Sequence, residues 1–172
     1  MRIQLDSIPD DGLDVHADAA TPWAVSAVEI ALGAAPDALR FDLRVSRIDD
    51  HVRVRGEGET SAELACDRCG DPVRLTLGGP VDLYYAPESY LKGADSELGE
   101  DDLDIGWFDG EALQLADVLS EAVALWAPDR VRCGDRGVVQ VGPRHACGLP
   151  PEATAGPDLR PPSPFAKLRL PE

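Results

Sequence analysis

Apolar and polar residues alternate along the middle of the chain with the period of two that is typical of β-strands. Starting at Phe41, every second side chain is apolar, and the same alternation returns at Val52 and Val54. Asp49 and Asp50 lie between these two runs, and acidic residues of this kind favour a tight turn. The pattern therefore predicts a β-hairpin.

Two further alternating runs follow this hairpin, over residues 60–66 and 73–85. Gly78-Gly79-Pro80 interrupts the second of them. Because glycine and proline are unfavourable inside a central strand, we predict a bulge or bend at that point. Together the four runs predict an antiparallel sheet with one buried face and one face in water.

Two segments have the signals of helices. Thr21 and Pro22, a cap residue and a first-turn proline, precede an apolar segment that Gly33 is suited to end. From Leu113 onward the apolar period becomes helical, and Pro128 ends the pattern. The apolar stripe that would pack on the sheet consists of Leu115, Val118, Leu119, Ala122 and Trp126.

The segments outside these elements are acidic or rich in proline. Residues 1–5 predict a short strand, whereas residues 6–19 are acidic and poor in apolar side chains and predict a loop. Residues 88–121 hold eleven acidic side chains and one basic side chain, Lys92. We interpret residues 88–111 as an acidic loop.

The fold class that follows is α+β, an antiparallel β-sheet with one or two helices packed on one face. A single domain over residues 1–147 is expected. The fold class also includes a Cys-containing, Pro-rich C-terminal extension, in which Cys147 precedes the tail. The tail over residues 148–172 has seven prolines, and we expect its PFAKLRL segment to dock on the domain.

Charge narrows the possible partners. The chain has 16 basic and 32 acidic residues, which gives a formal charge of −16. Such a field repels phosphate, so the composition argues against a general nucleic-acid binder and favours basic proteins as partners. The sequence contains no apolar run of about 18 residues and no secretory signal pattern at Met1–Val15, so we expect a cytoplasmic protein without membrane contact.

The cysteines carry the strongest chemical signal. Cys66 and Cys69 form a C-x-x-C at the end of a predicted strand, and Gly70 follows directly. This spacing is typical of a zinc knuckle, in which two thiolates bind one tetrahedral ion while backbone N–H groups of the turn offset their charge. The later Cys133 and Cys147 would complete a four-cysteine zinc site.

Other interpretations of the cysteines remain open. His145 lies two residues before Cys147 and is an alternative ligand. A C-x-x-C also serves thiol oxidoreductases, but these place it at a helix N-terminus, whereas strand patterns lie on both sides of Cys66 and Cys69. In a reducing cytosol, four free thiols without special chemistry are the remaining alternative.

The rest of the chain contains no recognisable catalytic motif. The three histidines are scattered, and each is expected at the surface. The acidic run between Asp101 and Glu111 fits neither register of an EF-hand loop. Trp107 and Phe108, which lie within that run, are expected to pack in the core.

A set of arginines falls on the polar positions of the first two predicted sheet strands. Such a stripe on the wet face of a sheet can contact RNA, but more often it balances neighbouring acids. Its members are Arg40, Arg44, Arg53 and Arg55.

Several motifs also occur in a diagnostic order. They are LACDRCGDPVRLTL, a strand ending in YYAP, an acidic linker, the helix LADVLSEAVALWAP, a late cysteine region and the closing PPSPFAKLRL. In this order, over residues 60–172, the sequence resembles the YceD family, the large ribosomal RNA subunit accumulation proteins. The most specific parts are the C-x-x-C with its following Gly-x-Pro and the phrase Ser-Pro-Phe-Ala-x-Leu at 163–168.

The resemblance implies a role in the synthesis, processing or accumulation of large-subunit (23S) rRNA and does not imply an enzyme. Our first hypothesis is a non-catalytic ribosome biogenesis factor that binds a basic ribosomal protein or an rRNA-processing factor, with a structural zinc knuckle that pins the tail to the sheet. The alternative is a direct rRNA-binding protein that uses the arginine-rich sheet face. A thiol oxidoreductase using Cys66 and Cys69 ranks last.

Overall fold

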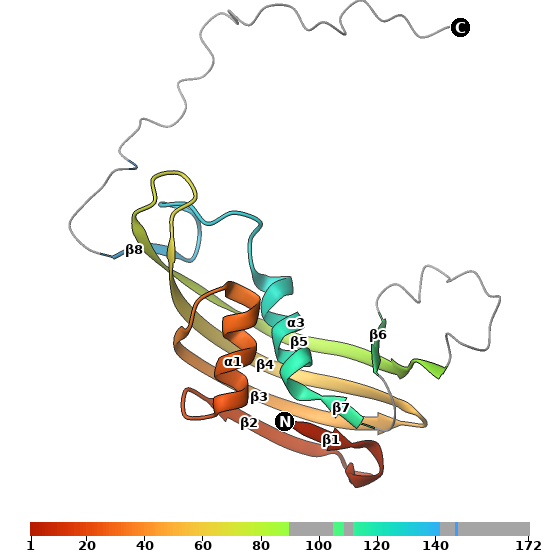
Figure 1. The fold of residues 1–172 in the computed structure, drawn as a ribbon. Helices are drawn as coiled ribbons and strands as arrows, with labels where there is room; N and C mark the ends of the chain where they lie inside the picture. The colour runs from red at the N-terminus through yellow and green to blue at the C-terminus, as the bar shows by residue number, and fades with distance from the viewer. Residues whose placement is uncertain (90–104, 109–111, 142–146, 148–172) are drawn as a thin grey trace, which may run out of the picture.

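The computed structural model describes residues 1–89, 105–108, 112–141 and 147 (Figure 1). A long twisted sheet has the strand order β2-β3-β4-β5-β6, with β8 also paired to β5, and a separate ribbon joins β1 to β7. In chain order the elements are β1 (Arg2–Gln4), the 3-10 turn η1 (Leu5–Ser7), β2 (Leu13–Asp18), α1 (Pro22–Leu32), β3 (Pro36–Ile48), β4 (His51–Ala65), β5 (Pro72–Pro87), β6 (Ile105–Phe108), β7 (Ala112–Gln114), α3 (Leu115–Trp126) and β8 (Val138–Gln140).

Both helices lie side by side on one face of this sheet (Figure 1). All strand pairs are antiparallel except β5 with β6, which is parallel. The predicted α+β class, an antiparallel sheet with helices on one face, is therefore confirmed. The predicted Pro-rich tail, residues 148–172, and its docking segment lie outside the described residues.

The central hairpins are longer than the alternation predicted. Strands β4 and β5 have 15 and 16 residues, and the two runs around Val54 and residues 60–66 belong to the single strand β4. The predicted turn between β3 and β4 is confirmed, because Ile48 pairs with His51 around Asp49-Asp50. Asp49 has a φ of 56°, a left-handed conformation that aspartate tolerates better than most residues.

The predicted bulge at Gly78-Gly79-Pro80 is wrong, because the register between β4 and β5 is unbroken through these residues. The N–H group of Thr76 donates to the carbonyl of Gly137 at 2.8 Å, so it points away from β4. Alternate residues of a strand point their N–H groups to the same side, which puts Pro80 in the same orientation. Its missing N–H therefore removes no hydrogen bond to β4, and the strand continues.

The first helix begins and ends as predicted, with Pro22 in its first turn and Gly33 as a left-handed C-cap with a φ of 71°. Thr21 stands at the N-cap, but its hydroxyl donates to the carboxylate of Asp18 at 3.0 Å and does not cap the helix. The predicted loop over residues 6–19 is wrong for Leu13–Asp18, which forms β2. Its short alternation places small apolar residues against the core and carboxylates outward, so it pairs with β3 despite its acidic composition.

The core lies between the sheet and the two helices. The predicted stripe of α3 is buried at Leu115, Val118, Leu119 and Ala122, and Trp126 packs at its edge. Trp126 stacks on Phe41 with the ring centroids 5.8 Å apart and the planes at 5°. Gly58 leaves the room for this pair, since a Cβ built there would come within 2.2 Å of the Phe41 ring.

One strand lies inside the segment predicted as an acidic loop. Ile105–Phe108 forms β6 beside β5, Phe108 is buried and Trp107 is half-buried. Within residues 88–111 the structure also describes Glu88 and Ser89, and the other members lie outside its description. The expected core packing of the aromatic pair is confirmed for Phe108 and partly for Trp107.

Candidate metal centre

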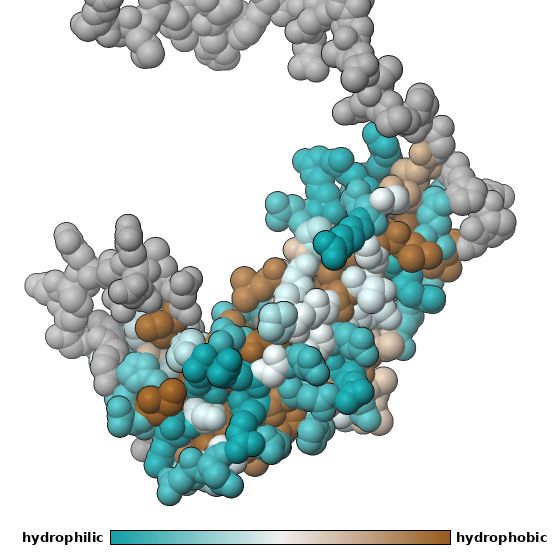
Figure 2. Space-filling view, turned by 180° about the vertical axis from the view of Figure 1, so that it is seen from behind, coloured by the Kyte–Doolittle hydropathy of each residue, from teal (hydrophilic) through white to brown (hydrophobic). Residues whose placement is uncertain are grey.

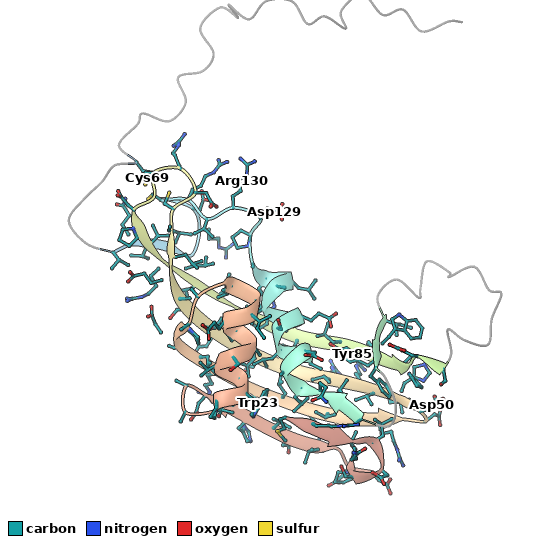
Figure 3. The ribbon with its side chains drawn as sticks, viewed as in Figure 1. Trp23, Asp50, Cys69, Tyr85, Asp129 and Arg130 are labelled. Atoms are coloured by element: carbon teal, nitrogen blue, oxygen red, sulfur yellow. The ribbon has the colours of Figure 1, made fainter. Side chains whose placement is uncertain are left out.

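Four cysteines meet at one end of the sheet, beside the β4–β5 connection that carries Cys69 (Figure 3). Cys66 directly follows β4, and Cys69 lies in the connection to β5. Cys133 follows α3, and Cys147 follows β8. The four Sγ atoms all lie within 4.8 Å of one another, so three separate chain segments converge on a single point.

The sulfur separations have the size of a tetrahedral thiolate site. Cys66 Sγ lies 3.6 Å from Cys147 Sγ, and Cys69 Sγ lies 3.8 Å from Cys133 Sγ. A zinc ion with Zn–S bonds of about 2.3 Å places its sulfurs about 3.8 Å apart. A disulfide needs about 2.05 Å, and all four cysteines are free thiols. The donor set therefore fits zinc.

Backbone N–H groups surround the most buried thiol. The N–H groups of Arg68 and Cys133 both donate to Cys66 Sγ at 3.4 Å. The turn that allows this closes through Gly70, whose N–H donates to the Cys66 carbonyl at 2.8 Å and whose φ is 75°. A glycine is needed there because that φ strains other residues. This arrangement is the offset of thiolate charge that the C-x-x-C spacing predicted.

The same contacts separate the acidities of the thiols. Burial raises the pKa of Cys66, but the N–H groups of Cys133, Arg68 and Cys69 outweigh it and lower that pKa to about 6. The neighbouring Cys69 side chain, followed by burial, raises the pKa of Cys147 to about 12. A thiolate at Cys66 is thus stabilised before any metal binds, and the cluster as a whole resists carrying four negative charges without a cation.

Asp67 is a supporting residue that the sequence reasoning missed. Its carboxylate accepts a hydrogen bond from the Val131 N–H at 2.6 Å, and its own N–H donates to the Val131 carbonyl at 2.8 Å. These two bonds hold the loop of Cys133 against the loop of Cys66. No local pattern could reveal them, because the partners lie 64 residues apart in the chain.

Among the alternatives that the sequence left open for the cysteines are His145 as a metal ligand and the C-x-x-C as a redox pair. His145 lies outside the residues that the structure describes, so its role as a substitute ligand is not tested. The C-x-x-C lies in a connection between two strands, not at a helix N-terminus. That placement lacks the helix dipole of thioredoxin-like sites, and the lowered pKa of Cys66 comes from nearby backbone N–H groups. The predicted surface position is confirmed for His16, whereas His51 is only partly exposed.

The sheet-face arginines form an ion-pair network on the wet face, which is largely hydrophilic (Figure 2). Arg44 pairs with Asp14 at 2.9 Å, and Arg53 with Asp82 at 2.8 Å. The Arg53 guanidinium also holds the pKa of Asp82 below its usual value. These arginines therefore balance neighbouring acids, as most such stripes do.

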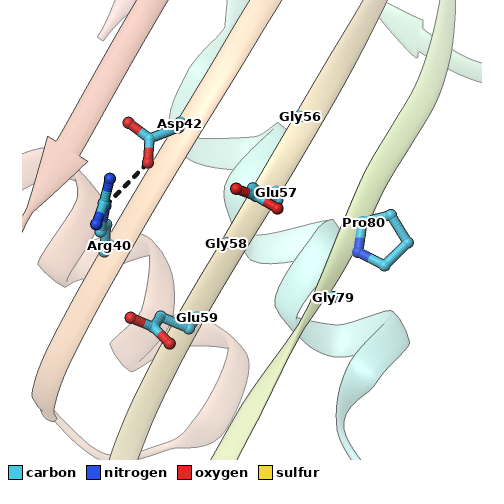
Figure 4. A pocket seen from close by; sticks show the side chains of 8 residues that line it. All are labelled: Arg40, Asp42, Gly56, Glu57, Gly58, Glu59, Gly79 and Pro80. Atoms are coloured by element: carbon cyan, nitrogen blue, oxygen red, sulfur yellow. Dashed lines mark hydrogen bonds and ion pairs between the residues drawn. The ribbon is translucent and has the colours of Figure 1, made fainter.

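Arg40 pairs with Asp42 beside a hollow of about 460 Å³ on the same face (Figure 4). Glu57 and Glu59 project into it, which makes its local charge negative. The four sheet-face arginines thus share their face with at least as many carboxylates.

A second set of arginines, which the sequence reasoning did not single out as a group, lies at the cysteine end. Arg68 belongs to the C-x-x-C loop, and Arg130 and Arg132 precede Cys133. All three are exposed, and with Asp67 and Asp129 they line a hollow of about 560 Å³. We call this group the knuckle arginines.

Comparison with known proteins adds the family. A family model described as large ribosomal RNA subunit accumulation protein YceD matches residues 54–170, which include all four cysteines. The chain belongs to the YceD family. Neither the curated proteins nor the solved structures contain a match to this YceD-family chain. Among its described residues, no helix has the length and apolar character needed to cross a membrane.

Proposed function

We propose that this YceD-family protein is a non-catalytic factor in the production of large-subunit rRNA, with a structural zinc ion held by Cys66, Cys69, Cys133 and Cys147. The family supports a role in the accumulation of that rRNA. The observation that carries the metal assignment is the convergence of four Sγ atoms within 4.8 Å from three chain segments.

The chemistry of the donor set favours a structural role over a catalytic one. Four thiolates fill the tetrahedral shell of zinc and leave no position for substrate or water. The ion would join the β4–β5 connection to Cys133 and Cys147. The three-residue strand β8 is the main regular element among the described residues after α3.

The partner follows from charge. A protein with a formal charge of −16 is attracted to basic surfaces, and ribosomal proteins and rRNA-processing factors that hold RNA have such surfaces. We therefore propose that the chain acts by binding one of these proteins. Direct RNA binding through the sheet face is the weaker alternative, because its arginines are already paired with carboxylates.

The function is tested in cells that lack the protein. Wild-type chain should restore the ratio of large-subunit to small-subunit rRNA, and Cys66→Ser should fail to restore it. Ser61→Ala, a small change on β4 outside the four-cysteine cluster, is the control and should complement fully. Normal rRNA ratios in the absence of the protein would contradict the proposed role.

The partner is tested by capture on tagged, zinc-loaded full-length chain. We expect a basic ribosomal protein or processing factor to be retained at low salt and released as salt rises, since surface charges are screened over about 8–10 Å at physiological ionic strength. Recovery of no ribosomal or processing component would contradict this part of the proposal.

A further inference from the structure

Five of the six described arginines on β3, β4 and β5 are ion-paired, with Arg47 as the exception, and the knuckle arginines differ from these five. Arg40, Arg44, Arg53, Arg55 and Arg74 each have a carboxylate oxygen within 4.0 Å. Arg68, Arg130 and Arg132 have no such partner among the residues that the structure describes. Within the part of the chain that the structure describes, their guanidinium groups therefore keep their donor capacity for an external ligand.

The hollow is also lined by two aspartates, which differ in how they are bonded. The Asp67 carboxylate is engaged by the Val131 N–H at 2.6 Å, within the fold. Asp129 is exposed and lies beside Arg130 (Figure 3). Three exposed guanidiniums thus face two exposed carboxylates, one of which is held by the fold, and the hollow keeps an excess of positive charge.

The geometry of the hollow suits an oxyanion ligand. Arg68 comes from the β4–β5 connection, while Arg130 and Arg132 come from the segment between α3 and Cys133, so two loops place arginines around one opening of about 560 Å³. Guanidinium groups bind phosphate through paired N–H donors, which makes arginine the preferred residue for phosphate recognition. The bonds between Asp67 and Val131 hold these two loops in register.

The negative net charge does not forbid such a contact, because screening confines electrostatic forces to about 8–10 Å at physiological salt. On the sheet face, the carboxylates beside the arginines would suppress binding of phosphate, whereas at the cysteine end the arginines outnumber the carboxylates that line the hollow.

We propose that the knuckle arginines bind backbone phosphates of RNA, at a surface distinct from the sheet face. The choice of RNA among phosphate-bearing polymers rests on the proposed function, while the surface itself rests on the unpaired arginines. The alternative ligand is an acidic peptide, whose carboxylates match the same guanidiniums.

The test is fluorescence anisotropy of the zinc-loaded full-length protein with a labelled single-stranded RNA of about 16 nucleotides, the upper site size of small single-strand binders. The triple variant Arg68→Ala, Arg130→Ala, Arg132→Ala should bind at least about tenfold more weakly and should reduce the salt slope by about two, since each lost phosphate contact removes about 0.7. The matched control is Arg44→Ala, Arg53→Ala, Arg55→Ala, which changes the net charge equally and should bind within about twofold of wild type.

Several outcomes would overturn the proposal. One is equal weakening by both triple variants, which would reduce the effect to net charge. Another is the absence of wild-type binding to the RNA at low salt. A third is tighter binding of a poly-glutamate peptide than of the RNA, measured as displacement of the labelled RNA by the peptide. Loss of zinc from the knuckle variant with RNA binding unchanged would make the arginines counter-charges of the thiolates. Metal content and far-UV circular dichroism therefore accompany each measurement.

The RNA-binding test is independent of the tests of the proposed function. If the knuckle arginines do not bind RNA, the expected rRNA ratio and the expected capture of a basic protein are unchanged.

Discussion

The Sγ atoms of Cys66 and Cys147 lie 3.6 Å apart although 81 positions separate the two residues in the chain. Such a separation equals the edge of a zinc–thiolate tetrahedron within about 0.2 Å. The approach matters because it ties the last described residue to the end of β4. Because Cys147 lies outside the C-x-x-C, its contribution to zinc binding can be measured with a substitution that leaves Cys66 and Cys69 in place.

Cys147→Ser should abolish stable zinc binding, because a hydroxyl is a much poorer zinc ligand than a thiolate. Protein purified without added metal should carry one zinc per wild-type chain with four protected thiols, and the variant should carry little metal with three reactive thiols. Elemental analysis and a free-thiol assay measure both, with Ser61→Ala as control. A wild-type chain without metal and with four reactive thiols would refute the zinc assignment.

Chelation should unfold the cysteine end without unfolding the sheet. The core between the sheet and the helices is built from buried apolar residues on β3, β4, β5, α1 and α3, and Cys66 lies at its margin. Hydrogen exchange should therefore lose protection at residues 66–71 and 131–141 while β3 and α3 keep theirs. Global unfolding after metal removal would show that the core depends on the ion.

Asp67→Ala should weaken zinc binding by about 10- to 100-fold, the usual effect of removing a group that orients metal ligands. The change removes the 2.6 Å hydrogen bond that holds Val131, and with it Cys133, against the C-x-x-C loop. Competition with a chelator of known affinity measures the loss. Asp129→Ala, which removes a carboxylate of the same hollow, is the control, and equal weakening by both would mean that charge alone is responsible.

Gly58→Ala should destabilise the fold by about 1–3 kcal/mol, the range for overpacking a dense core. The added Cβ would lie within 2.2 Å of the Phe41 ring, which is itself stacked on Trp126. Urea unfolding gives the free energy of unfolding. Glu59→Ala, one residue further on the outer face of β4, should change it by less than about 0.5 kcal/mol. An unchanged stability of the glycine variant would show that Phe41 moves without cost.

Tyr85→Phe should lower stability by about 1 kcal/mol near neutral pH, because the Tyr85 hydroxyl donates to the Glu121 carboxylate at 2.5 Å. Burial, followed by this carboxylate, raises the pKa of Tyr85. The folded state therefore keeps a proton that the unfolded chain releases near pH 10, so stability falls as pH rises above about 10.

The fall in the free energy of unfolding with rising pH should be smaller for Tyr85→Phe than for wild type when both are unfolded at about pH 8 and about pH 10.5. Tyr84→Phe, on the exposed side of the same strand, should retain the wild-type decline. Identical pH profiles for wild type and Tyr85→Phe would contradict the assignment.

Periodicity predicted the parts of the fold whose cause is local. The alternation from Phe41, the helix ended by Gly33 and the apolar stripe of α3 all appear, since each depends on which faces of a single element meet water. It missed β2, whose three apolar residues are too few to signal a strand until β3 offers them a partner. It misread Pro80, because the direction of a missing N–H depends on which strand lies on which side.

For the candidate site, the spacing of Cys66 and Cys69 was sufficient to predict a knuckle, because the turn that points two thiols to one side is local. The approach of Cys133 and Cys147 was a hypothesis from the sequence, and the chain's path around α3 and β8 brings them within reach. The arginines show the same division. The sequence placed four of them correctly on the wet face of the sheet, yet their pairing with aspartates depends on strand register, and the unpaired set around Arg130 depends on two loops meeting.

By itself, then, the sequence determined the long strands, both helices, the α+β class, the C-x-x-C turn and the family, because short-range geometry and an ordered set of motifs carry that information. Only the tertiary structure decided which charges neutralise each other and which four sulfurs share one point. Apart from local pairs such as Arg40 with Asp42, those relationships join residues up to 81 positions apart, and distances of that kind are set by how strands pair and helices pack.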